Sequence, residues 1–112
     1  MARKTVYLLL LALWMVAGSA TASDKYGWQP EKGKKLYISK IKKQLCRKMP
    51  VKKFTQAHTQ KEWQSMIEDG SFVREVTKLC PDFGKNDFTE KQIADLGDAV
   101  INYARDSYNI PS

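Results

Sequence analysis

The sequence has little of what metalloenzymes, nucleotide-binding enzymes and membrane-spanning proteins need. It contains one histidine and two cysteines, so a metal site built from several histidines is excluded. No glycine-rich phosphate loop, HExxH motif or CxxC pair occurs. The longest apolar stretch, from Val6 to Val16, has 11 residues, whereas a membrane-spanning helix needs about 20. We therefore expect no catalytic site, no resident metal and no membrane-spanning helix.

The N-terminal residues are typical of an export signal. Arg3 and Lys4 precede the apolar stretch, and Ala20-Thr21-Ala22 supplies the small residues of a cleavage site. We expect residues 1–22 to be removed, which leaves one domain of residues 23–112 without a stable membrane anchor. The mature protein is then expected in the periplasm or as a secreted protein, and nucleic acid is not expected as a partner.

Positive charge is concentrated in the first half of the predicted domain. The whole chain has a formal net charge of +7. Residues 24–61 contain twelve Lys and Arg against two acidic residues, whereas residues 62–112 contain five against ten. Such a basic half is either a solvated helix surface or a means of steering the protein toward an acidic partner or an anionic membrane. Both interpretations stay open at this point.

The two cysteines, Cys46 and Cys80, both lie in the predicted mature domain. An even number of cysteines in an exported protein favours a disulfide. Closing this loop of about 35 residues would remove unfolded-chain entropy worth about 3–4 kcal/mol, a large share of the stability of a small domain. The alternative is that both are free, buried thiols.

Apolar spacing and capping residues predict an all-α fold with long helices at both ends and short ones between. Pro30 is suited to open a first helix that runs to about Lys48 and is stopped by Pro50. Capping boxes begin at Thr59 and Thr89, each followed three residues later by Glu or Gln. The other predicted elements are a short helix that Gly70 ends, a short helix at 72–79, a loop at 82–87 and a last helix reaching about Ser107.

Three side chains are able to ligate a metal or haem, but their positions favour structural roles. His58 directly precedes a predicted helix cap, and we expect it at the surface beside Trp63. Met49 and Met66 fall on apolar faces, where core packing is expected rather than copper binding.

Two segments of the chain resemble class I cytochromes c. Residues 33–40 (GKKLYISK) are similar to the N-terminal helix of that family. Residues 80–84 (CPDFG), followed by residues 88–96 (FTEKQIADL), are similar to its methionine loop and C-terminal helix. The resemblance covers residues 31–105 and implies a small cytochrome-c-like domain whose terminal helices cross. It also implies that Gly33 and Tyr37 pack against the last helix.

The haem-binding residues of the family have no counterpart in this chain. The two haem-attaching cysteines would fall at Ile41 and Gln44, the axial histidine at Leu45, and the axial methionine at Cys80. The resemblance therefore implies a domain without covalently attached haem, and no cofactor is expected. It further implies that a Cys46–Cys80 bond links the two elements that the haem iron joins in the family.

The function implied by the resemblance is that of an accessory or docking module for an acidic periplasmic redox protein or complex. Cytochromes of this family often meet such partners through lysines around the haem edge. The lysines available for docking here are Lys34, Lys35, Lys40, Lys42, Lys43, Lys48, Lys52 and Lys53.

Three alternatives remain open. The protein could be an electron carrier that holds haem non-covalently, with His58 as the candidate ligand. It could be a thiol-disulfide redox protein, since the basic residues around Cys46 favour its thiolate. The basic half of the chain would also suit a cationic membrane-active or inhibitor protein.

Overall fold

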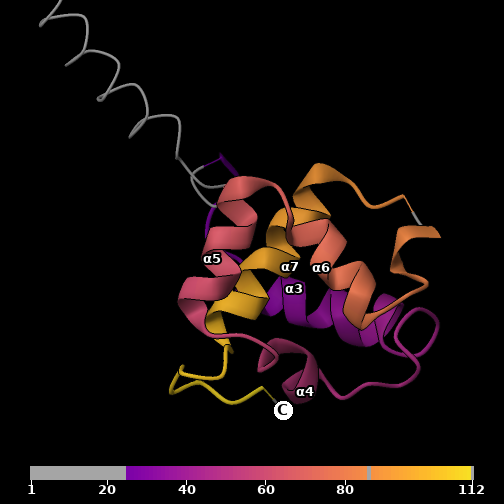
Figure 1. Ribbon diagram of the computed structural model, residues 1–112, viewed down its shortest axis with the longest axis horizontal. Coiled ribbons are helices and arrows are strands. Elements are labelled where there is room, and N and C mark those ends of the chain that lie inside the picture. Colours follow the sequence, from indigo (N-terminus) through magenta and orange to yellow (C-terminus); the bar gives the residue numbers. More distant parts are fainter. Residues whose placement is uncertain (1–24, 86, 112) are drawn as a thin grey trace, which may run out of the picture.

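The computed structural model describes residues 25–85 and 87–111, and the predicted signal at residues 1–22 lies outside them. The described part of the chain is helical and contains no strand, as predicted (Figure 1). Its helices are α3 (Pro30–Leu36), α4 (Val51–Thr55), α5 (Gln60–Asp69), α6 (Phe72–Leu79) and α7 (Glu90–Asn102). A π-helical turn at Tyr37–Ile41 continues α3, and a 3-10 turn at Phe83–Lys85 lies in the predicted loop.

Helix α3 packs directly against α7, and the two cross in Figure 1. The close approach depends on Gly33, which is buried in α3. A Cβ atom at this position would lie 2.8 Å from the Cβ of Ala99 and nearer still to the carbonyl oxygen of Asp95. The Tyr103 hydroxyl at the end of α7 also donates a hydrogen bond to Glu31 of α3. The expected packing of Gly33 against the last helix is therefore confirmed.

A row of aromatic rings fills the centre of the domain. Tyr37 stacks on Phe54 with ring centroids 4.3 Å apart, and Phe54 in turn lies 6.1 Å from Trp63. Trp63 meets Phe72 edge-on at 5.8 Å. All four side chains are buried, and the indole N–H of Trp63 donates to the carbonyl of Thr55 at 2.8 Å. The row therefore joins the π-helical turn, α4, α5 and α6 in one core.

Both capping boxes form as predicted. The Thr59 hydroxyl accepts from the Glu62 N–H, and the Glu62 side chain accepts from the Thr59 N–H. Thr89 and Gln92 make the same pair of bonds at the start of α7. Gly70 ends α5 with a φ of 84°, a conformation that glycine adopts without a steric penalty.

The first helix is shorter than predicted. It does not run to Lys48, because the π-helical turn ends at Ile41 and the chain then folds back through residues 42–50. The Tyr37 hydroxyl donates to the carbonyl of Met49 at 2.7 Å, which holds the returning segment against the helix. Pro50 does not end the first helix but precedes α4 as its N-cap, and α4 was not predicted.

The last helix also ends earlier than predicted, at Asn102 rather than near Ser107. The N–H of Arg105 does not bond within the helix but donates to the carbonyl of His58 at 3.1 Å. The Ser107 hydroxyl turns back and donates to the carbonyl of Asn102 at 2.6 Å. Tertiary and capping bonds thus take the place of the last predicted helical turn.

Candidate functional site

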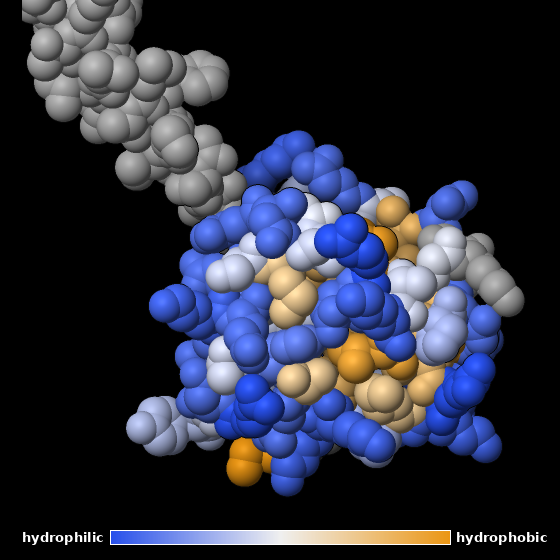
Figure 2. Space-filling view, viewed as in Figure 1, coloured by the Kyte–Doolittle hydropathy of each residue, from blue (hydrophilic) through white to orange (hydrophobic). Residues whose placement is uncertain are grey.

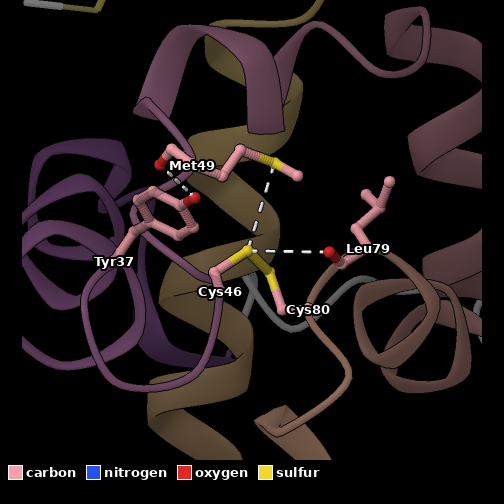
Figure 3. The surroundings of a disulfide bond; sticks show 5 residues. All are labelled: Tyr37, Cys46, Met49, Leu79 and Cys80. Carbon is pink, nitrogen blue, oxygen red and sulfur yellow. Dashed lines mark hydrogen bonds between the residues drawn. A yellow bond between two sulfur atoms is a disulfide. The ribbon is translucent and has the colours of Figure 1, made fainter.

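Cys46 and Cys80 form a disulfide, so the predicted pairing is confirmed (Figure 3). The bond spans a sequence separation of 34 and joins the turn after the π-helical segment to the residue that ends α6, with the two Cα atoms 4.2 Å apart. Cys46 is 2% exposed and Cys80 is fully buried. The disulfide therefore ties the first and second halves of the chain together inside the core.

The surroundings of the disulfide are compact. The Sδ of Met49 lies 4.0 Å and the carbonyl oxygen of Leu79 lies 3.8 Å from the Cys46 sulfur. Both groups point toward the disulfide (Figure 3). These are packing contacts, since a disulfide sulfur carries no proton to donate. Burial raises the pKa of the Tyr37 hydroxyl well above its ordinary value, so this group stays protonated and remains the donor to Met49.

A basic depression of about 370 Å³ opens beside the disulfide. Its wall carries the side chains of Arg47, Lys48, Lys53 and Lys78, and no acidic residue is among its described lining residues. The remaining lining residues are Cys46, Met49, Pro50, Leu79 and Pro81. We call this surface, defined by its four basic residues, the basic depression.

The backbone at the rim of the basic depression has an unusual conformation. Arg47 and Lys48 have φ angles of 51° and 63°, in the left-handed region that non-glycine residues seldom occupy. The N–H of Lys48 donates to the carbonyl of Lys42 at 2.7 Å, and that of Met49 donates to Cys46 at 2.9 Å. Strained backbone of this kind persists only where surrounding contacts hold it. Here the disulfide and these bonds hold two neighbouring cations at the surface.

The lysines predicted to dock a partner do not all lie together. Lys48 and Lys53 border the basic depression, whereas Lys40 borders a different one with Asp87 and Gln92. Lys34 packs over the Tyr103 ring at 5.6 Å and pairs with Glu31 at 3.1 Å, which leaves 17% of its side chain exposed. The exposed members of the remaining set are Lys35, Lys43 and Lys52, and Lys42 is half-buried.

Two basic residues of the depression were missed by sequence analysis. Arg47 follows Cys46 directly, and Lys78 lies two residues before Cys80. Pairing the two cysteines therefore brings these cations to one surface from opposite halves of the chain. The signal that could have found them is their position beside the two paired cysteines.

His58 lies beside Trp63, as predicted, with ring centroids 4.7 Å apart and an edge-on geometry. Its Nε2 lies 2.7 Å from Oε2 of Glu75, and its Nδ1 lies 3.6 Å from Oε1 of Glu62. Both ring nitrogens therefore face carboxylates. His58 and Met66 both line a shallow depression on the surface. The other candidate methionine, Met49, lies beside the disulfide.

Among the described residues, no group of three or more His, Cys, Asp or Glu side chains is arranged to hold a metal ion. In the same part of the chain, no helix has both the length and the apolar character needed to cross a membrane.

Comparison with known proteins finds no matching family model, no matching curated protein and no matching solved structure.

Proposed function

We propose that this protein is an exported, cytochrome-c-like module without haem that docks an acidic redox protein through the basic depression. The observation that carries the proposal is the position of the disulfide under that depression. In the cytochrome c resemblance, Cys80 takes the place of the axial methionine and Cys46 follows the place of the axial histidine. The basic depression therefore corresponds to the haem edge, which is the surface that such cytochromes present to their partners.

The packing of the interior supports a domain that works without haem. Tyr37, Phe54 and Trp63 occupy the centre of the core as a contiguous aromatic row. The two sulfurs are bonded to each other, and the only histidine directs both ring nitrogens at carboxylates. The side chains present therefore do not fit haem, and a haem carrier with His58 as ligand is the weaker alternative.

Burial of the disulfide also argues against thiol-disulfide exchange as the function. Exchange begins with the attack of a thiolate on an accessible sulfur. Cys46 and Cys80 are 2% and 0% exposed, and the bond closes a long loop rather than linking neighbouring residues. A structural role, in which the disulfide shapes the basic depression, accounts for both features.

The charge of the basic depression supports docking by electrostatic steering. Its four cations come from three segments: the turn at 47–48, α4 and α6. Glu75 of α6 pairs loosely with one of them, since its oxygen lies 3.9 Å from the Lys78 nitrogen. Clustered charge of one sign raises the rate of encounter with an oppositely charged partner, and salt reduces that rate.

A photo-cross-linking experiment in the host tests the proposal. A photoreactive amino acid at Lys53 should capture an acidic redox protein from the periplasmic fraction, and the same group at Lys61, which lies outside the basic depression, should not. The captured protein is then titrated with the purified domain at about 20 mM and about 200 mM salt.

A matched pair of charge reversals distinguishes docking from general basicity. Lys53→Glu/Lys78→Glu should weaken binding about tenfold or more and reduce its salt dependence. Lys32→Glu/Lys61→Glu makes the same change in net charge away from the basic depression and should bind nearly as the unaltered protein does. Equal loss in both variants, or capture that does not depend on the position of the photoreactive group, would refute the docking assignment.

A further inference from the structure

A second cavity shares no lining residue with the basic depression. It has a volume of about 450 Å³ and lies between α5, the beginning of α6 and α7, with Trp28 at its mouth. The space-filling view shows apolar residues reaching the surface between polar ones on the face formed by α5, α6 and α7 (Figure 2). Its lining residues are Trp28, Gln64, Ile67, Gly70, Phe72, Val73, Glu90, Ile93, Ala94, Gly97, Asp98 and Ile101. We call it the apolar pocket.

The size and walls of the apolar pocket match those of small-molecule sites. Such sites measure about 300–1,000 Å³ and combine apolar walls with a few polar groups. Trp28 is 51% exposed and Val73 is 43% exposed, so the mouth presents large apolar side chains to solvent. Both lie where a bound molecule would cover them.

A glycine in the interior of α7 keeps the floor of the apolar pocket open. Gly97 is buried in the middle of the helix, where glycine is less favourable than alanine by about 1 kcal/mol. A Cβ atom here would lie 3.0 Å from Cδ1 of Ile67 on the facing helix. A side chain at position 97 would therefore push Ile67 and reduce the pocket.

The polar side chains that line the apolar pocket are two carboxylates and one amide. Asp98 and Glu90 contribute carboxylates, and Gln64 contributes an amide. One oxygen of Asp98 already accepts the N–H of Gln29 at 2.9 Å, and burial raises the pKa of this carboxyl. Glu90 pairs with Lys25 at 3.3 Å in an exposed position. With two carboxylates and no basic residue among the described lining residues, the pocket offers acceptors to a hydrogen-bond donor and disfavours an anion.

From these observations we propose that the apolar pocket binds a small, mainly apolar molecule that carries one hydrogen-bond-donating end group, such as an amine. The apolar body packs against Ile67, Ile93 and the ring of Trp28. The donating end lies toward the carboxylates of Asp98 and Glu90. This assignment is independent of the docking function proposed above.

The fluorescent amine 1-aminoanthracene is a suitable probe, because its emission increases in an apolar site. Protein expressed from the full coding sequence should bind it saturably at one site. Val73→Asp places a carboxylate at the mouth and should weaken binding about tenfold or more. Ile38→Asp is the matched control, because Ile38 has a similar exposure of 38% and lies outside the apolar pocket.

A second pair of variants guards against loss of folding in Val73→Asp. Trp28→Ala removes the ring at the mouth and should also weaken binding about tenfold or more, whereas Tyr108→Ala, which alters a fully exposed ring, should not. Unsaturable binding, or equal affinity in Trp28→Ala and Tyr108→Ala, would overturn the proposal. A concentration-dependent dimer that Val73→Asp abolishes, without probe binding, would also overturn it by assigning the pocket to a second copy of the chain.

The end group is tested with a probe of opposite character. Anthracene-1-carboxylate has the same apolar body but an anionic end. It should bind at least about tenfold more weakly than 1-aminoanthracene, because carboxylates of the pocket repel it. Equal affinities for the two probes would contradict the donor-end assignment.

Discussion

Breaking the Cys46–Cys80 disulfide is the perturbation whose effect follows most directly from the structure. The bond closes a loop with a sequence separation of 34. In the loop-closure treatment, releasing it returns entropy to the unfolded chain worth about 3–4 kcal/mol at 25 °C. Small domains are stable by only about 5–15 kcal/mol, so the reduced protein should unfold at a much lower denaturant concentration.

Substituting the cysteines adds a packing term to this loss. Both sulfurs are buried, and Cys46→Ala/Cys80→Ala replaces them with hydrogen in a close-packed core. The small cavities that result should add on the order of 1 kcal/mol to the loss from loop opening. The double variant is therefore expected to be somewhat less stable than the reduced unaltered protein.

Urea unfolding followed by tryptophan emission measures these differences, because Trp63 is fully buried and becomes exposed on unfolding. The unaltered protein is measured with and without reductant, and the double variant in both conditions serves as the control. Reductant should lower the stability of the unaltered protein and leave that of the double variant unchanged. The denaturant dependence of the unaltered protein should also steepen, since the unfolded chain without the cross-link exposes more surface.

Two results would refute this reasoning. One is a loss of less than about 1 kcal/mol on reduction, which would mean that the unfolded chain is already restricted without the bond. The other is rapid alkylation of the cysteines in the native protein without reductant, which would show that the disulfide is absent.

Two further predictions concern helix packing and acid stability. Gly33→Ala should destabilise the domain by about 3 kcal/mol in urea unfolding, because the added methyl overlaps α7 near Ala99. Gly84→Ala is the control and should be nearly neutral, because its added methyl has room. Similar losses of stability in both variants would contradict the packing argument. A hydrogen bond from the Tyr103 hydroxyl lowers the pKa of Glu31, and one from the Thr59 N–H lowers the pKa of Glu62, both below the ordinary 4.5. The ionised carboxylates therefore stabilise the folded domain fully above pH 4.5. This contribution is lost as the pH falls through the lowered pKa values of the folded protein. The urea midpoint should therefore fall on acidification from about pH 6 to about pH 3, and an equally steep fall in Glu31→Gln/Glu62→Gln would rule out these groups as its source.

Features set by neighbouring residues could be predicted from the sequence. The capping boxes at Thr59 and Thr89 formed as predicted, because each bond joins residues three apart along the chain. The end of α5 at Gly70 and the start of α3 at Pro30 are likewise local, since they follow from the allowed backbone angles of glycine and proline. The disulfide was predictable because only one pair of cysteines exists.

The candidate site could be predicted only in part. Lys48 and Lys53 were among the predicted docking residues, and both border the basic depression. Arg47 and Lys78 were missed, because a charge count along the chain does not show which cations the disulfide brings together. Lys34 was predicted as a docking residue, but it lies over an aromatic ring beside Glu31, a position set by the packing of α3 on α7.

The sequence by itself determined the helical class and the starts of α3, α5 and α7, because these depend on capping bonds and backbone angles within a few residues. It also determined the pairing of the cysteines, because the chain has only two. Tertiary structure alone decided where the first and last helices end. The Tyr37 hydroxyl donates to the Met49 carbonyl, and the Arg105 N–H donates to the His58 carbonyl. These hydrogen bonds join residues too far apart in the sequence for helical periodicity to predict them. Tertiary structure also decided the basic depression and the apolar pocket, since each forms where segments far apart in the chain meet in the folded protein.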